Sequence, residues 1–143
     1  MELYSNSLKL YLINIMLDIF ASILLTLIFF ITGINKAMDY AGTVNTIESK
    51  FNFLNSDIMY NIITVLVILL ELLAPIVIVY SAITGQLSYW AFISIIMLVV
   101  FTLVATGLFY FPPSKENKLM IMIHLGLVGG LLALLSLNVQ LRQ

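Results

Sequence analysis

Four long runs of apolar residues alternate with short polar breaks along the chain. They cover Leu10–Ile34, Ile62–Ile83, Tyr89–Phe111 and Leu119–Leu137. At a helical rise of about 1.5 Å per residue, each run is long enough to cross roughly 30 Å of hydrocarbon. The first run is longer than a bilayer requires, so we expect its helix to tilt or to extend past the interface. The pattern predicts an all-α integral membrane four-helix bundle with both termini on the same side.

The connection between the first two runs, Asn35–Asp57, is the only long one. Its apolar residues recur at spacings of three and four, with polar residues between them: Val44, Ile47, Phe51 and Leu54. This spacing predicts a short amphipathic surface helix over roughly Thr43–Leu54. The sequence leaves open whether this helix only caps the end of the bundle or gates it.

The composition agrees with a membrane location. Apolar residues make up 62% of the 143 residues and charged residues 9%, whereas soluble domains have about 45–50% and 25%. The length suits a single domain, residues 1–143. The net charge of −1, without runs of one sign, gives no indication of a nucleic-acid partner. We expect the lipid bilayer to be the main partner, in a bacterial cytoplasmic membrane or, alternatively, an organellar membrane.

The predicted orientation of the chain in the membrane depends on Lys36. The positive-inside rule counts basic residues beside the spans. Loops one and three contain Lys36, Lys50, Lys115 and Lys118, whereas the termini contain Lys9, Arg142 and the α-amine. This count places the long loop in the cytoplasm, unless Lys36 points into the bundle, in which case the two sides are equal.

One face of the first span is polar or small, although polar groups cost free energy in hydrocarbon. Its members follow one another in steps of three or four, which keeps them on one side of a helix: Tyr11, Asn14, Asp18, Ser22, Thr26, Phe29, Gly33 and Lys36. The remaining positions are almost entirely Leu, Ile, Phe and Met. We therefore expect this face to contact protein rather than lipid.

Counting from the midpoint of each span places several polar residues at similar depths. Glu71 lies at the middle of the second span, Asp18 about 6 Å toward the termini, and Thr102 and His124 about 5–6 Å toward the long loop. Thr106 lies closer still to that loop. We expect these residues and Lys36 to form a buried polar cluster. The cluster can fix helix register through hydrogen bonds, bind a ligand or handle protons, or contact another subunit, and the sequence leaves all three open.

Pro75 leaves the backbone carbonyl of Glu71 without its usual hydrogen-bond donor. A proline cannot donate to the carbonyl four residues earlier, which is that of Glu71. Inside a membrane this carbonyl needs a donor from a neighbouring helix or a water. The N–H of His124, a threonine hydroxyl or the Lys36 ammonium could serve. We rank His124 ahead of Lys36 for this role, because Lys36 must reach farther.

Small residues predict close helix packing. Gly126 and Gly130 form a GxxxG pair in the fourth span, and Gly33 and Pro75 occupy the first and second spans. Gly126 lies about 200° around the helix from His124. The pair can therefore pack against span one or three of the same chain, or in a homodimer, while His124 faces the bundle interior.

The sequence lacks the residues of several reaction centres. It contains one histidine and no cysteine, so one chain cannot supply bis-histidine haem ligation, a three-histidine metal site or an iron–sulfur cluster. There is no nucleotide-binding loop and no evident nucleophile–histidine pair. We expect no metal, no catalytic residues and no tightly bound cofactor. A carboxylate and a histidine can still transfer protons to a bound quinone when another protein supplies the electrons.

Three motifs resemble those of DoxX-like membrane proteins. They are the run Phe30–Asp39, in which Gly33 precedes Lys36 by three, then Glu71-Leu72-Leu73-Ala74, and finally Met122–Gly130, in which His124 precedes glycines. The four-span plan and the amphipathic first loop are also similar, so the resemblance covers nearly the whole chain. Two features depart from the family. A third-helix histidine is absent from Leu108–Phe111, and Pro75 stands where glycine is more usual.

The resemblance implies two different roles. Some DoxX-like proteins belong to membrane redox systems, such as an archaeal thiosulfate:quinone oxidoreductase, and others are accessory membrane components. Because the redox ligands are lacking, we expect a non-catalytic accessory or assembly subunit beside a larger membrane protein. The alternative is a quinone- or lipid-binding component of a redox complex. A small proton-coupled transporter built around Glu71 is a third interpretation, against which the sequence shows no internal repeat.

Overall fold

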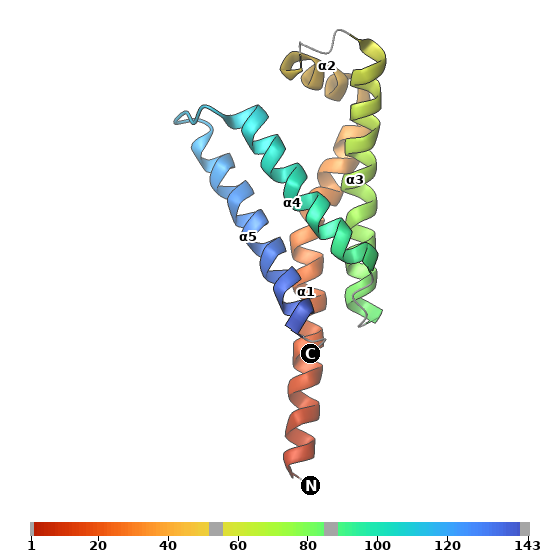
Figure 1. The fold of residues 1–143 in the computed structure, drawn as a ribbon, viewed down its shortest axis with the longest axis vertical. Coiled ribbons are helices and arrows are strands. Elements are labelled where there is room, and N and C mark those ends of the chain that lie inside the picture. Colours follow the sequence, from red (N-terminus) through yellow and green to blue (C-terminus); the bar gives the residue numbers. More distant parts are fainter. Residues whose placement is uncertain (1, 52–55, 85–88, 141–143) are drawn as a thin grey trace.

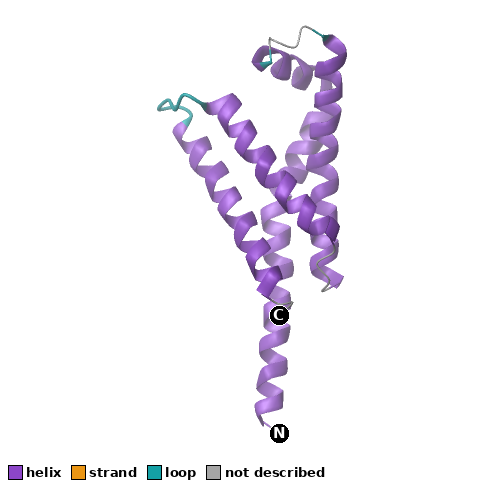
Figure 2. Ribbon diagram, in the orientation of Figure 1, coloured by secondary structure: helices purple, strands orange, loops and turns teal. Residues whose placement is uncertain are grey.

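The computed structural model describes residues 2–51, 56–84 and 89–140, and helices form nearly all of this part of the chain (Figures 1 and 2). The helices are α1 (Glu2–Met38), α2 (Tyr40–Lys50), α3 (Asp57–Thr84), α4 (Tyr89–Tyr110) and α5 (Lys118–Gln140). No strand occurs in the described ranges. The predicted all-α fold is confirmed.

Four of these helices are long and apolar enough to cross a membrane. The candidate spans are Leu12–Met38, Asp57–Thr84, Tyr89–Tyr110 and Lys118–Ser136, close to the predicted ranges. Large apolar side chains cover their outer faces, for example Leu66 (60% exposed) and Leu73 (55%). Such surfaces are stable in lipid but not in water. The chain is therefore a small multi-pass membrane protein.

The first span belongs to an unusually long helix. α1 has 37 residues and is about 55 Å long at the usual helical rise. Its N-terminal part extends past the other helices, and both ends of the chain lie away from α2 (Figure 1). The expectations that the first helix extends past the bundle and that the termini share one side agree with this arrangement.

The four long helices form two pairs that diverge. α1 packs closely on α3, and α4 packs on α5. The pairs meet around a buried core that includes Ala74, Ile78, Leu98, Leu131 and Leu134. Toward α2 the α4–α5 pair tilts away from α1 and α3 (Figure 1). The end of the bundle near α2 is therefore wider than the opposite end.

The predicted amphipathic helix is present as α2, shifted toward the N-terminus. The carboxylate of Asp39 caps it by accepting the Gly42 N–H at 3.1 Å. Ile47 is buried, and Val44 and Phe51 are half-buried, whereas Leu54 lies outside the described residues. α2 lies at the wide end of the bundle, beside the start of α3 (Figure 1).

Two tyrosines connect this helix and the residue after it to α3. The hydroxyl of Tyr40 lies 2.9 Å from the side-chain oxygen of Asn61, and Tyr60 donates to the carbonyl of Phe51 at 3.0 Å. These bonds involve the first five residues of α3, which begins five residues before the predicted Ile62. The polar start of α3 is thus part of the contact with α2.

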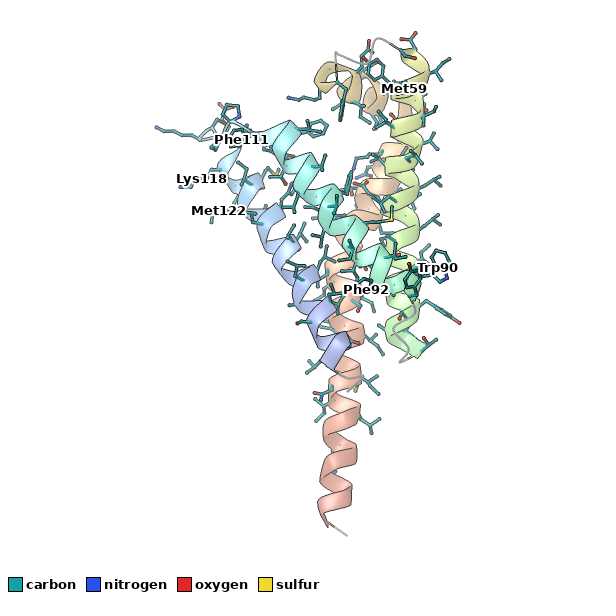
Figure 3. The ribbon with its side chains drawn as sticks, viewed as in Figure 1. Met59, Trp90, Phe92, Phe111, Lys118 and Met122 are labelled. Atoms are coloured by element: carbon teal, nitrogen blue, oxygen red, sulfur yellow. The ribbon has the colours of Figure 1, made fainter. Side chains whose placement is uncertain are left out.

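Side chains show how the ends of α4 are placed. Phe111 and Lys118 lie at the end of the bundle nearer α2, whereas Trp90 and Phe92 lie toward the opposite end (Figure 3).

Lys36 points into the bundle, where it pairs with Glu71. Without Lys36 the basic residues beside the two membrane faces are equal in number, so the charge count no longer assigns an orientation.

Candidate ligand-binding site

The divergence of the two helix pairs leaves a cavity of about 410 Å³ that is partly open to the outside. Apolar side chains of α1, α3 and α4 form most of its wall, among them Phe29, Val67 and Phe101. Thr43, Thr46 and Ile47 of α2 and the adjoining Phe51 form one end. Known small-molecule sites have volumes of about 300–1,000 Å³ and similarly apolar walls with a few polar groups.

An ion pair forms the polar part of one wall. The Lys36 ammonium lies 2.6 Å from both carboxylate oxygens of Glu71, and Thr32 donates to one of them at 3.2 Å. The side chain of Glu71 is 3% exposed and that of Lys36 is 31% exposed. Within a membrane, charged side chains occur mainly as such mutually neutralising pairs.

The local sequence explains how Lys36 reaches Glu71. A Cβ on Gly33 would lie only 3.0 Å from the Cβ of Glu71, so α1 and α3 approach closely at this level. Lys36 lies almost one turn later on α1, and helical side chains tilt toward the N-terminus of their helix. The lysine therefore extends back toward the level of Gly33 and of the carboxylate.

A second polar group lies on the wall formed by α4 and α5. Nδ1 of His124 lies 2.8 Å from Oγ1 of Thr106. The rings of His124 and Tyr110 make an edge-to-face contact, with centroids 5.1 Å apart. Thr106 donates to the carbonyl of Thr102 at 2.6 Å, and Thr102 donates to that of Leu98 at 2.7 Å. His124, Thr102 and Tyr110 line the cavity.

The structure places most of the predicted cluster around this cavity. Lys36, Glu71, Thr102 and His124 all line it. Asp18 does not, because it lies fourteen residues before Thr32 on α1, which is about 21 Å along the helix. Counting from the midpoint of the first span was wrong for Asp18, since the α1 residue at the level of Glu71 is Gly33.

The ranking of His124 over Lys36 concerned the backbone carbonyl of Glu71, and it stays a prediction because no described hydrogen bond involves that carbonyl. The side chains of these residues pair as follows. The carboxylate binds Lys36, and His124 binds Thr106 instead. The two groups share a cavity without a direct bond between them in the described part of the chain. The expected burial of Glu71 is confirmed, since the residue is 2% exposed.

The protein-facing stripe of α1 is confirmed from Asp18 onward. Ser22, Thr26 and Phe29 are buried, and Asp18 is half-buried. Asn14 is exposed, and the side chain of Tyr11 lies outside the described part. Sequence reasoning missed the role of Thr32, although it lies four residues before Lys36 on the same helix.

Of the predicted packing residues, some contact a neighbouring helix and one does not. Gly33 contacts α3, and a Cβ on Gly130 would lie 2.5 Å from the side chain of Leu25, which places α5 against α1. Pro75 is buried. A Cβ on Gly126 would meet nothing within 4 Å, so its expected role in packing is not seen among the described residues.

Neither a metal-binding cluster nor a similar protein assigns a function to the cavity. Among the described residues, no group of three or more His, Asp or Glu side chains is placed to hold a metal ion. The chain matches no protein-family model, no curated protein and no solved structure. The resemblance to DoxX-like proteins therefore stays a prediction.

Proposed function

We propose that this chain is a membrane-embedded binding protein for one lipophilic molecule with a polar head group, of the quinone or lipid class. The observation that supports this proposal is the cavity in which the Lys36–Glu71 pair shares an apolar enclosure with Thr102 and His124. The apolar walls would contact the hydrocarbon part of the ligand, and the polar groups would contact its head.

Each member of the ion pair has a distinct role in this proposal. A lysine ammonium has three N–H donors, and two of them are directed at the oxygens of Glu71. The remaining donor is available to an oxygen of the ligand. Glu71 neutralises the charge of Lys36 and fixes its direction, so that the cavity presents a strong donor without a net charge.

The proposed function is binding rather than turnover. With one histidine and no cysteine, the chain has few residues suited to hold an electron carrier. In this proposal, any reduction or oxidation of a bound quinone would require electrons from a partner protein.

The second candidate function is that of an accessory or assembly subunit beside a larger membrane protein. Gly126 and Gly129 are exposed on α5, and a Cβ added to either would meet nothing within 4 Å. Small residues allow another membrane helix to approach closely. This surface would suit a helix of a partner or of a second copy, and crosslinks from Gly126→Cys in native membranes would identify which.

The cavity proposal can be tested by filling the cavity. Ala105 lines the cavity on α4, and Ala105→Phe should occupy it. Leu103→Phe is a matched control, because Leu103 lies two residues away and is 47% exposed. Each protein is purified gently from its native membrane, and the lipophilic molecules that accompany it are identified by mass spectrometry.

We expect the wild type and Leu103→Phe to retain one such molecule per chain and Ala105→Phe to lose it, with unchanged helical content. Equal ligand content in all three proteins, or none in the wild type, would contradict the proposal.

A further inference from the structure

The hydroxyl of Thr106 has one proton and two close partners. Its oxygen lies 2.6 Å from the carbonyl oxygen of Thr102 and 2.8 Å from Nδ1 of His124. A carbonyl oxygen can only accept, and two oxygens at 2.6 Å repel unless a proton lies between them. The Thr106 proton therefore belongs to the bond with Thr102. It follows that Nδ1 of His124 carries a proton and donates it to Thr106.

This assignment fixes the state of the other ring nitrogen. A neutral imidazole has one N–H, so protonation at Nδ1 leaves a lone pair on Nε2. His124 lines the cavity, and its Nε2 has no hydrogen-bond partner among the described residues. The hydroxyl of Thr102 also has its proton committed, to the carbonyl of Leu98. This wall of the cavity therefore presents acceptors.

The opposite wall presents a donor. Both oxygens of Glu71 already accept bonds from Lys36, and one also accepts from Thr32. The carboxylate is 3% exposed, so it is a poor acceptor for a ligand. The open polar position on this wall is the remaining N–H of Lys36.

From this arrangement we infer that the cavity prefers ligands whose head group bears a hydroxyl, such as a long-chain phenol or alcohol, over ethers or ketones of the same shape. The inference rests on the proposed function. The ligand hydroxyl donates to Nε2 of His124, whereas a ligand with acceptors only would place its lone pairs against that of Nε2. For a quinone-class ligand, the cavity favours the reduced, dihydroxy form over the dione.

The single histidine of the chain allows a direct test. The full chain is labelled with ¹⁵N in histidine and placed in lipid nanodiscs. The probes are para-octylphenol and its methyl ether, which differ in the hydroxyl proton. Before addition of a probe, we expect the ring proton on Nδ1. The phenol should shift the Nε2 resonance, and the methyl ether should leave it unchanged.

Binding measurements with the same probes provide a second readout. We expect the phenol to bind the wild type about tenfold more tightly than the ether, as the loss of one hydrogen bond implies. His124→Phe should bind both probes equally. Thr106→Val should divide the ring proton between the two nitrogens and reduce the preference, and Thr106→Ser should restore it. Met122→Leu is the control, because Met122 is 61% exposed on α5.

The outcomes separate this inference from the proposed function. Equal affinity of the wild type for both probes, a proton on Nε2, or a preference that persists in His124→Phe would overturn the inference and leave ligand binding intact. If the wild type binds neither probe and carries no lipophilic molecule from its native membrane, the inference and the proposed function are both wrong.

Discussion

The ammonium of Lys36 lies 2.6 Å from each carboxylate oxygen of Glu71 and joins α1 to α3 inside the membrane. Removing either charge leaves the other in a medium where an unpaired charge is unfavourable. Because the pair also lies in the cavity wall, it contributes both to the packing of two helices and to the polarity of the site.

Lys36 and Glu71 should stabilise the fold as a pair, so that removing one charge destabilises the protein more than removing both. We expect Lys36→Met and Glu71→Leu each to reduce the free energy of unfolding by about 3 kcal/mol, because one buried charge is left without a partner. The double variant should recover most of this loss, since two apolar residues replace the pair. Unfolding in mixed micelles measures these values, with Leu73→Ala, on the lipid-facing side of α3, as control. Additive losses in the double variant would show that the residues do not act as a pair.

The glycines should differ in their tolerance of a methyl group. Gly33→Ala places a Cβ 3.0 Å from that of Glu71 and 3.1 Å from the side chain of Leu72, and we expect a loss of about 1–3 kcal/mol from overpacking. Gly126→Ala meets open space and should stabilise the helix by up to about 1 kcal/mol. The same unfolding assay ranks them, and an equal effect of the two substitutions would argue against the close α1–α3 approach.

The face that α2 turns to the bundle should be shielded from water. Spin labels at Val44 and Ile47 should react more slowly with a water-soluble relaxation agent than labels at Asn45 and Ser49, because the first two are half-buried or buried and the others exposed. The absence of cysteine from the chain makes single-site labelling straightforward. Uniform accessibility at the four positions would show that α2 does not pack this face against the bundle.

The topology predicts that Met1 and Gln143 lie on the same side of the membrane. Four spans return the chain to the side on which it began. Fusions of a reporter that is active in one compartment only, made at each terminus, should give the same result. Opposite results would require an odd number of crossings.

The purified chain should show no absorption band of haem or flavin. Haem needs axial ligands and iron–sulfur clusters need several thiolates, whereas the sequence offers His124, methionines and no cysteine. Visible absorption spectra of the pure protein, taken at known concentration, make the measurement. A band at near-stoichiometric occupancy would contradict the proposal of a binding protein without its own electron carrier.

Hydropathy predicted the spans because lipid places a simple demand on sequence: most residues of a long run must tolerate hydrocarbon. The residues that form the site could also be singled out from the sequence, because polar side chains inside a span are costly and therefore few. Their pairing was not predictable, because counting from midpoints assumes that each helix is centred in the bilayer. α1 begins far outside the bundle (Figure 1), so its register against α3 is set by the close approach of Gly33 to Glu71, which a depth count does not contain.

The close pairing of Lys36 with Glu71 also determines how the protein responds to a membrane potential. A voltage acts on net charge at about 2.3 kcal/mol per elementary charge per 100 mV. Two opposite charges separated by 2.6 Å span less than about a tenth of a 30 Å hydrocarbon layer, so the field acts on them only as a small dipole. Entry of an uncharged ligand into the cavity moves no net charge. Occupancy of the cavity should therefore be the same in energised and de-energised membranes.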